Sequence, residues 1–288
     1  MTRRVLLLGK PLRRRHSVVM HNAAFDAAGI DARYELAELD EGDVRPAVAA
    51  ARGPGFLGLG VTAPYKQLVA GLVDEVEGDS AEIGAVNNVV RTDGGRLVGF
   101  NSDAPGFRAG VELVLGRPLA GLAVVIAGAG GAAHAVVHAC VRGRVRAVAI
   151  VNRTPEAAAE LVARFTGSAN ASGTTLASMS YDDPGFRAAA RAADLAVNAT
   201  TVGMLQPGMT IPVEELPDGA TVFDLVYVPP ETPLLHAARE RGLRAANGSE
   251  MLIQQAAIAF ERWTGVGGMG GVMRAAVAPL LADPTARA

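Results

Sequence analysis

The stretch LAVVIAGAGGAAHAVV, residues 122–137, reads as a strand, a glycine turn and a helix. The apolar run 123–127 has the length and composition of a buried strand, and Gly128, Gly130 and Gly131 form the turn before Ala132 opens the helix. Backbone N–H groups at such a turn can hold a pyrophosphate, because small residues allow close approach and the helix dipole favours negative charge. The stretch therefore predicts a dinucleotide-binding turn.

The next predicted strand, 147–151, ends at Asn152, Arg153 and Thr154. Sites that prefer NAD place an Asp or Glu about 20 residues after the turn to hold the ribose hydroxyls. A guanidinium and a hydroxyl at this place instead suit the 2′-phosphate of NADP. These residues could instead have no part in cofactor binding: Arg153 would be solvated, Thr154 would be the N-cap and Pro155 the first residue of the next helix. Thr154 can also cap the helix and face the ribose at the same time.

The bulk composition is that of a folded globular protein rather than of a nucleic-acid-binding or membrane protein. The chain has 288 residues, of which 50% are apolar and 19% are charged, so one large or two ordinary domains can form around sizeable cores. The formal net charge of −2 differs from the basic balance of a general nucleic-acid binder. No window approaches the roughly 18 to 20 apolar residues of a membrane span.

Two further features indicate a cytoplasmic protein. The single cysteine, Cys140, lies in the apolar segment AAHAVVHACV, which predicts a buried structural thiol and no internal disulfide. The N-terminal apolar run, Val5 to Leu8, is too short for a signal peptide.

Short apolar runs alternate with alanine-rich helical stretches, which predicts an α/β fold with parallel strands and helical crossovers. A domain boundary is expected near 104 to 120, and the apolar positions of 250–263 fit a helix with one buried face. The predicted strands are 5–8, 56–61, 89–91, 123–127, 147–151, 195–198, 221–225 and 244–246. The predicted helices are 17–28, 64–72, 132–142, 155–165, 233–241 and 250–263.

Three small-residue turns in the first half present polar groups: GVTAPYK (60–66), GAVNNVV (84–90) and GFNSDAPGF (99–107). They make Lys66, Asn87, Asn101 and Asp103 candidates for a shared polar cluster. Each residue also has a structural alternative: Lys66 as a solvated helix residue, the asparagines as turn formers, and Asp103 as an N-cap.

Taken together and in order, these motifs resemble the shikimate dehydrogenase family. The resemblance runs over almost the whole chain and rests on GKP (9–11), VTAPYK, GAVNN, NSDAPG, GAGGAA, NRT (152–154), VNATTVGM (197–204), DLVY (224–227) and NGSEMLIQQAAIAF (247–260). It implies an N-terminal substrate domain, 1–104, completed by C-terminal helices in 250–288, and an NADP-binding Rossmann domain, 105–249. It also implies reversible hydride transfer between NADP(H) and a ring hydroxy acid, such as shikimate, in the shikimate pathway of aromatic amino acid biosynthesis.

The resemblance also assigns roles to residues. Lys66 matches the catalytic lysine and Asp103 its partner aspartate; an ammonium can stabilise the charge that develops on a ketone oxygen and deliver a proton. The positions matching substrate ligands are Ser17, Thr62, Asn87, Tyr227 and Gln255. Asn198, Thr200 and Gly248 match positions that line the nicotinamide side.

The stretch GKPLRRRHSVVMH (9–21) is the main departure from the family pattern. The family carries two serines here that bind the substrate carboxylate; without gaps, the second falls on Ser17 and the first on Arg15. An arginine can bind a carboxylate bidentately, but it is bulkier than serine. Arg13 and Arg14 lack the interleaved aromatic residues of a nucleic-acid patch.

Two more departures leave alternatives open. Asn88 stands where a threonine commonly follows the VN pair, and with Arg15 it allows quinate, aminoshikimate or another carboxylated polyol as substrate. Ala157 replaces an arginine that NADP-using members often carry, so use of NAD as well as NADP is possible.

The protein could alternatively be a non-catalytic regulator that keeps the fold and binds a nucleotide. The retained Lys66 and Asp103 argue against this alternative. No metal is expected, because His134 and His138 lack the glutamate of a zinc motif. The sequence leaves monomer and homodimer open.

Overall fold

The computed structural model describes residues 2–12 and 15–282. The chain forms two compact units, unit 1 (Met1–Gly106 and Ile253–Ala288) and unit 2 (Phe107–Leu252). Both are α/β, as the alternation of strands and helices predicted. Arg13 and Arg14 lie outside the described residues.

Unit 1 contains a mixed six-stranded sheet in the order β2-β1-β3-β5-β6-β4. Strand β1 pairs in parallel with β2 and β3, whereas β5 is antiparallel to both β3 and β6, and β4 is parallel to β6. The strands are β1 (Arg3–Gly9), β2 (Ala32–Glu38), β3 (Phe56–Val61), β4 (Glu75–Val76), β5 (Asn88–Arg91) and β6 (Leu97–Phe100).

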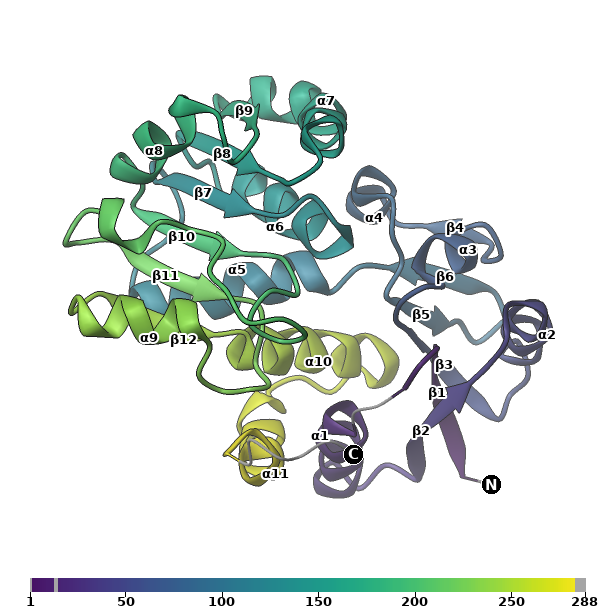
Figure 1. Cartoon of the computed structure of the whole chain (residues 1–288). Coiled ribbons are helices and arrows are strands. Elements are labelled where there is room, and N and C mark those ends of the chain that lie inside the picture. Colours follow the sequence, from purple (N-terminus) through teal and green to yellow (C-terminus); the bar gives the residue numbers. More distant parts are fainter. Residues whose placement is uncertain (1, 13–14, 283–288) are drawn as a thin grey trace. The chain divides into compact units, whose positions relative to one another are not determined.

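Both ends of the chain contribute to the packing of unit 1. The rings of Phe25 and Phe260 lie 5.0 Å apart, and the Trp263 indole nitrogen donates to the Val89 carbonyl at 2.9 Å. Helices α1 and α11 lie side by side (Figure 1). The helices are α1 (His16–Ala27), α2 (Glu41–Ala50), α3 (Lys66–Ala70), α4 (Gly78–Ile83), α10 (Ser249–Thr264), which begins in unit 2, and α11 (Gly270–Ala282).

Unit 2 contains an all-parallel six-stranded sheet in the order β12-β11-β10-β7-β8-β9, and Figure 1 shows its strands side by side. Chain order reverses between β7 and β10, which is the switch point where doubly wound sheets bind dinucleotides. The strands are β7 (Ala123–Ala127), β8 (Ala147–Val151), β9 (Thr175–Met179), β10 (Leu195–Asn198), β11 (Thr221–Asp224) and β12 (Arg244–Asn247).

The helices of unit 2 cover this sheet with small apolar side chains. Cys140 on α6 is fully buried, as predicted, and burial raises the pKa of its thiol to about 12. His134 and His138 of the same helix approach the Phe165 ring edge-on, which is a packing arrangement. The helices are α5 (Asp103–Leu115), which begins in unit 1, α6 (Gly131–Arg142), α7 (Pro155–Ser172), α8 (Pro184–Arg191), the 3₁₀ turn η1 (Val213–Glu215) and α9 (Pro233–Glu240).

Apolar runs identified most of the strands, including the edge strand β12, but missed β2, β4, β6 and β9. Edge strand β2 alternates buried with exposed positions in its first half, and edge strand β9 has no buried position, so neither sequence contains a continuous apolar run. Helices α2, α4, α5 and α8 were likewise not predicted, whereas α11 lies within the C-terminal helices that the family resemblance implied. Helix α7 continues past the predicted end at 165 to Ser172, where Gly173 in the left-handed conformation ends it.

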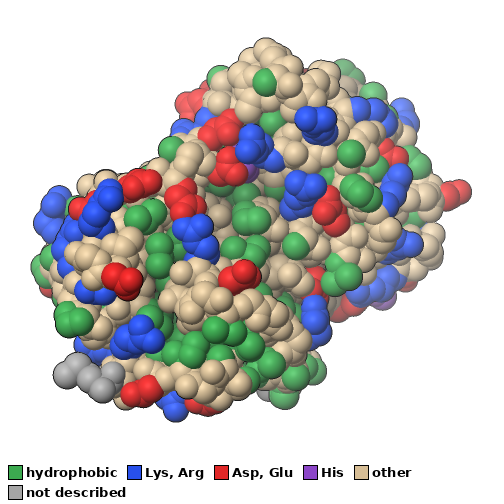
Figure 2. Space-filling view, turned by 180° about the vertical axis from the view of Figure 1, so that it is seen from behind, with side chains coloured by type: hydrophobic (Ala, Val, Ile, Leu, Met, Phe, Trp, Pro, Cys, Tyr) green, Lys and Arg blue, Asp and Glu red, His purple; other side chains and the backbone are tan. Residues whose placement is uncertain are grey.

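The surface carries both signs of charge. On the face shown in Figure 2, basic and acidic side chains are interspersed. In the described part of the chain, no helix is long and apolar enough to span a membrane.

Candidate active site

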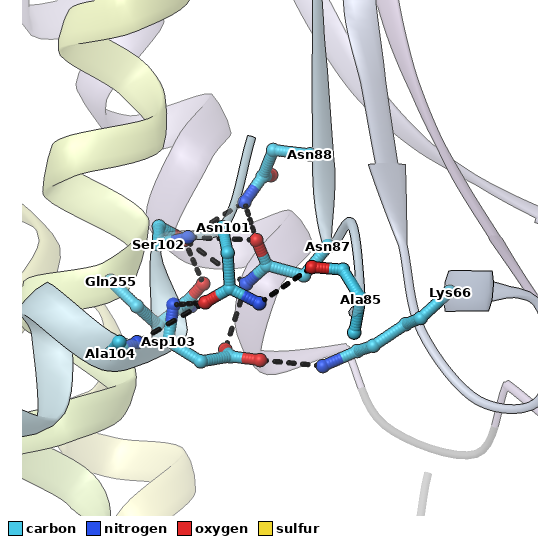
Figure 3. Close-up of polar contacts among 9 residues, drawn as sticks. All are labelled: Lys66, Ala85, Asn87, Asn88, Asn101, Ser102, Asp103, Ala104 and Gln255. Carbon is cyan, nitrogen blue, oxygen red and sulfur yellow. Dashed lines mark hydrogen bonds and ion pairs between the residues drawn. The ribbon is translucent and has the colours of Figure 1, made fainter. Parts of the chain in front are cut away.

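An ion pair between Lys66 and Asp103 forms the centre of the candidate site in unit 1. Lys66 is the first residue of α3 and Asp103 is the first residue of α5. The Lys66 Nζ lies 2.6 Å from Oδ2 of Asp103, and the two side chains are 27% and 16% exposed. Figure 3 shows them extending toward each other. The pair is thus largely buried but can still be reached by a small molecule.

Asn101 builds the turn that carries Asp103. Its Oδ1 accepts from the backbone N–H groups of Asp103 and Ala104 at 2.9 and 3.2 Å, and its Nδ2 donates to the Ala85 carbonyl at 3.0 Å. Asn101 therefore caps the start of α5, which is the role that the structural alternative gave to Asp103. The Asp103 carboxylate instead faces Lys66.

Asn87 connects this pair to a buried amide network. Its Nδ2 donates to Oδ1 of Asp103 at 2.8 Å and to the Ser102 hydroxyl at 3.1 Å. Its Oδ1 accepts from the Ser102 backbone N–H and from Nδ2 of Asn88, both at 2.8 Å. The three turns of the sequence therefore do form one polar cluster, which Figure 3 shows as a whole.

Gln255 reaches the same cluster from α10. The Ser102 hydroxyl donates to Oε1 of Gln255 at 3.2 Å. A Cβ on Gly106 would lie 2.6 Å from that of Gln255, so the glycine of NSDAPG allows α10 to approach this closely. The sequence analysis did not single out Ser102, although this residue lies inside the motif NSDAPG. A serine between Asn and Asp does not indicate whether its hydroxyl points into the cluster or toward solvent.

The remaining unit 1 candidates lie on neighbouring turns. Arg15 occupies the N-cap position of α1 and is exposed, Ser17 is half-buried in its first turn, and Thr62 is half-buried directly after β3. In the described part of the chain, no hydrogen bond joins the Arg15 or Ser17 side chain to the Lys66 cluster. Their predicted contact with a substrate carboxylate stays a prediction.

The glycine turn of unit 2 combines a glycine of positive φ with open space at the start of α6. Gly128 has φ +110°, and a Cβ there would lie 2.9 Å from the Thr200 methyl group. By contrast, a Cβ on Gly130 or Gly131 would meet no atom within 4 Å. Open space therefore lies beside the first residues of α6, where Ala132 follows, and it suits the pyrophosphate of a dinucleotide.

The end of β8 presents the predicted adenine-side residues. Asn152 donates through its side chain to the Thr154 carbonyl at 2.9 Å, and Arg153 and Thr154 are exposed. Thr154 stands at the N-cap of α7, but its side chain accepts no capping hydrogen bond. Burial raises the pKa of the Tyr181 phenol, and the nearby positive charge of Arg153 partly offsets that rise. Sequence reasoning did not single out Tyr181.

A second polar network holds the residues matched to the nicotinamide side. Asn198, the last residue of β10, accepts from the Thr200 hydroxyl at 2.7 Å and donates to the buried Asp224 at 2.8 Å. A Cβ on Gly248 would lie 2.2 Å from the Leu225 carbonyl, so this glycine permits close backbone packing. Tyr227 is half-buried just after β11, and its predicted contact with substrate stays a prediction.

Comparison with known proteins agrees with the motifs. Residues 7–89 match the shikimate dehydrogenase substrate binding domain, 113–202 the shikimate / quinate 5-dehydrogenase model, and 248–277 the shikimate 5′-dehydrogenase C-terminal domain. The chain belongs to the shikimate dehydrogenase family. A relative named shikimate dehydrogenase (NADP(+)), from Moorella thermoacetica, is 38% identical over 98% of this chain and 96% of its own.

Solved structures of this family share the fold. Shikimate 5-dehydrogenase from Thermus thermophilus, in complex with NADP(H) and shikimate, is 33% identical with a TM-score of 0.84, covering 96% of this chain and 99% of that one. Quinate dehydrogenase from Corynebacterium glutamicum, in complex with NAD, is also 33% identical, with a TM-score of 0.87 and the same coverage. Members similar to this chain thus differ in both substrate and cofactor.

Proposed function

We propose that the protein is an NADP-dependent shikimate dehydrogenase that transfers a hydride reversibly between NADP(H) and the ring of shikimate or 3-dehydroshikimate. The observation that carries the proposal is the Lys66–Asp103 ion pair at 2.6 Å within a chain of this family. Unit 1 would bind the substrate and unit 2 the cofactor. The single buried Cys140 supports a cytoplasmic location.

The chain's own residues supply the proton chemistry. When the ketone is reduced, negative charge develops on its oxygen, and the Lys66 ammonium can stabilise that charge and then donate a proton to it. In the oxidative direction, the neutral amine accepts the hydroxyl proton. Asp103 holds Nζ in place, and Asn87 in turn fixes the carboxylate. Bound NADPH would supply the hydride.

The residues of unit 2 fit NADP. Gly128, Gly130, Gly131 and Ala132 would hold the pyrophosphate, because open space lies beside the start of α6. Arg153 and Thr154, both exposed, would face the 2′-phosphate with Asn152 beside them. Because Ala157 removes a second arginine of the kind that NADP-using members often carry, we expect measurable activity with NAD as well.

In unit 1, Arg15 and Ser17 would bind the substrate carboxylate, while Thr62 and Gln255 would face the ring hydroxyls. Asn87, whose amide is fully hydrogen-bonded within the protein, would orient the Asp103 carboxylate at the same site. Arg15 is exposed at the start of α1, where the family carries a serine. Together with Asn88, this replacement leaves quinate, or another carboxylated polyol, as the second candidate substrate, and one of the similar structures is a quinate dehydrogenase. Tyr227, which belongs to unit 2, is the remaining residue that matches a substrate position of the family.

The test measures initial rates with purified protein, following NADPH or NADH absorbance with shikimate, quinate and aminoshikimate. We expect shikimate to be oxidised with NADP⁺ and the activity to be lost in Lys66→Ala. Arg33→Ala is the matched control, since it removes an exposed ion pair, Arg33–Asp26, of the same 2.6 Å length in unit 1. Turnover of quinate alone would transfer the proposal to that substrate, and no turnover of any acid would refute it.

A further inference from the structure

We propose that Asn88 is a positioning residue that, together with Ser102, fixes the amide of Asn87 with its donor end toward Asp103. The inference rests on the proposed function, and it concerns a residue at which this chain departs from the family's usual threonine. Asn88 is 4% exposed. Its side-chain nitrogen donates into the protein, to Asn87 and Ser102.

Two unambiguous groups determine the orientation of the Asn87 amide. The Ser102 backbone N–H can only donate, and it lies 2.8 Å from Oδ1 of Asn87. The Asp103 carboxylate accepts, and its Oδ1 lies 2.8 Å from Nδ2 of Asn87. The assignment of oxygen and nitrogen in this amide is therefore fixed by its neighbours.

The same reasoning fixes the next members of the network. The Asn88 atom that faces Oδ1 of Asn87 must be the amide nitrogen, and its second proton goes to the Ser102 hydroxyl, both at 2.8 Å. That hydroxyl also accepts from Asn87, so its own proton is left for Oε1 of Gln255. Asn88 thereby influences both Asn87 and Gln255, which belong to the proposed substrate site (Figure 3).

A threonine could not replace both contacts of Asn88. Its hydroxyl has one proton, so it can donate to Asn87 or to Ser102 but not to both at once. With both protons of Nδ2 and both lone pairs of Oδ1 in use, the Asn87 amide cannot rotate without breaking hydrogen bonds inside a buried cluster. Asn88 therefore holds Asn87 so that its Nδ2 donates to Oδ1 of Asp103, the carboxylate oxygen that does not pair with Lys66.

The kinetic test compares Asn88→Val and Asn88→Thr with the wild type in shikimate oxidation at a series of pH values. We expect kcat to be about 10-fold lower in Asn88→Val and about 3-fold lower in Asn88→Thr. The pH profile of kcat/KM should shift in both variants, since Asp103 beside Lys66 loses a fixed donor, while KM for NADP⁺ stays unchanged.

Asn22→Val is the matched control, because the Asn22 amide also makes two hydrogen bonds in unit 1, to the Tyr34 backbone at 2.8 and 3.1 Å. It should lower stability and leave kcat and the pH profile as in the wild type. A wild-type kcat in Asn88→Val would overturn the inference, as would a lower kcat with an unshifted pH profile. If Asn88→Val does not fold, Asn88→Thr decides by the same criteria.

A second readout does not depend on activity. The side-chain amide protons of Asn87 should exchange slowly with solvent in the wild type and about 10-fold faster in Asn88→Val, as measured by NMR. If the wild type turns over no shikimate, the proposed function fails while this exchange still tests the orientation of Asn87. Equal exchange in the wild type and both variants would overturn the inference.

Discussion

Asp103 in unit 1 and Asp224 in unit 2 are both carboxylates bound by an asparagine, yet Asp103 is partly buried, Asp224 is fully buried, and their surroundings differ. Asp103 pairs with the Lys66 ammonium and keeps 16% of its side chain exposed. Asp224 is fully buried and accepts from neutral donors: the Asn198 amide at 2.8 Å, the Val226 N–H at 3.0 Å and the Thr232 hydroxyl at 2.6 Å. The first pairs with a cation and is partly exposed, whereas the second is bound by backbone and neutral side chains.

The network around Asp224 joins two loops that follow β10 and β11. Asn198 accepts from the hydroxyls of Thr200 and Thr210, and through Asp224 it is linked to Thr232 at the start of α9. Burial raises the pKa of Asp224, and the three hydrogen bonds oppose that rise. The two aspartates thus differ in their partners: the proposed catalytic pair places a partly exposed carboxylate beside a cation, whereas the fully buried carboxylate accepts from neutral donors.

Asp103→Asn should give the largest effect, and it should fall on activity. The amide cannot serve as an anionic partner for Lys66, so we expect kcat/KM to fall about 10²–10⁴-fold. The free energy of unfolding should change by less than about 1 kcal/mol, because partly exposed ion pairs contribute little. Rates and urea denaturation on one preparation measure both. A large loss of stability in Asp103→Asn would show that Asp103, like Asp224, is needed to stabilise the fold.

Asp224→Ala should reverse that pattern. It leaves the Asn198 amide, the Val226 N–H and the Thr232 hydroxyl without their acceptor, and a buried group left unpaired costs about 1–3 kcal/mol. We expect unit 2 to lose about 3 kcal/mol of stability in urea denaturation.

Asp224→Asn is the matched variant for this comparison. Its amide oxygen can still accept from Asn198 and Val226, and the Thr232 hydroxyl can turn to accept from its amide nitrogen. Most of the stability should therefore return. If the asparagine variant were as unstable as the alanine variant, the charge of Asp224 would be required, and the contrast with Asp103 would fail.

The sequence predicted the Asp103 site better than the Asp224 site for a physical reason. Lys66, Asn87 and Asp103 stand in turns beside glycines and prolines, where polar residues are conspicuous. Asp224 and Asn198 end apolar strands and resemble ordinary strand ends, so their mutual contact could not be foreseen. The sequence also does not indicate where a side chain points. It identified Asn88 as a departure from the family's usual threonine, but only the structure shows its side chain donating to Asn87 and Ser102.

His21 on α1 extends the comparison to an ionisable group buried among aromatic rings. Its ring stacks on Tyr34 at 4.4 Å and lies 5.1 Å from Trp263. Among the described residues, its Nδ1 has no hydrogen-bond partner. Burial lowers the pKa of His21 to about 3, against an ordinary value of 6.5. Unlike both carboxylates, this group is kept neutral by its surroundings.

The smallest predicted effect follows from that lowered pKa. Between pH 6.5 and about 3, the unfolded chain binds a proton at His21 that the folded chain does not, so stability falls as the pH falls. The slope is about 1.4 kcal/mol per pH unit, or about 2 kcal/mol between pH 6.5 and 5.

His21→Phe retains an aromatic ring against Tyr34 and removes the titration. Urea denaturation followed by fluorescence of Trp263, the single tryptophan, should show the wild type losing stability relative to this variant below pH 6.5. Above pH 7 the difference between the two proteins should be constant, and parallel curves through the acid range would show that His21 takes up its proton in the folded state.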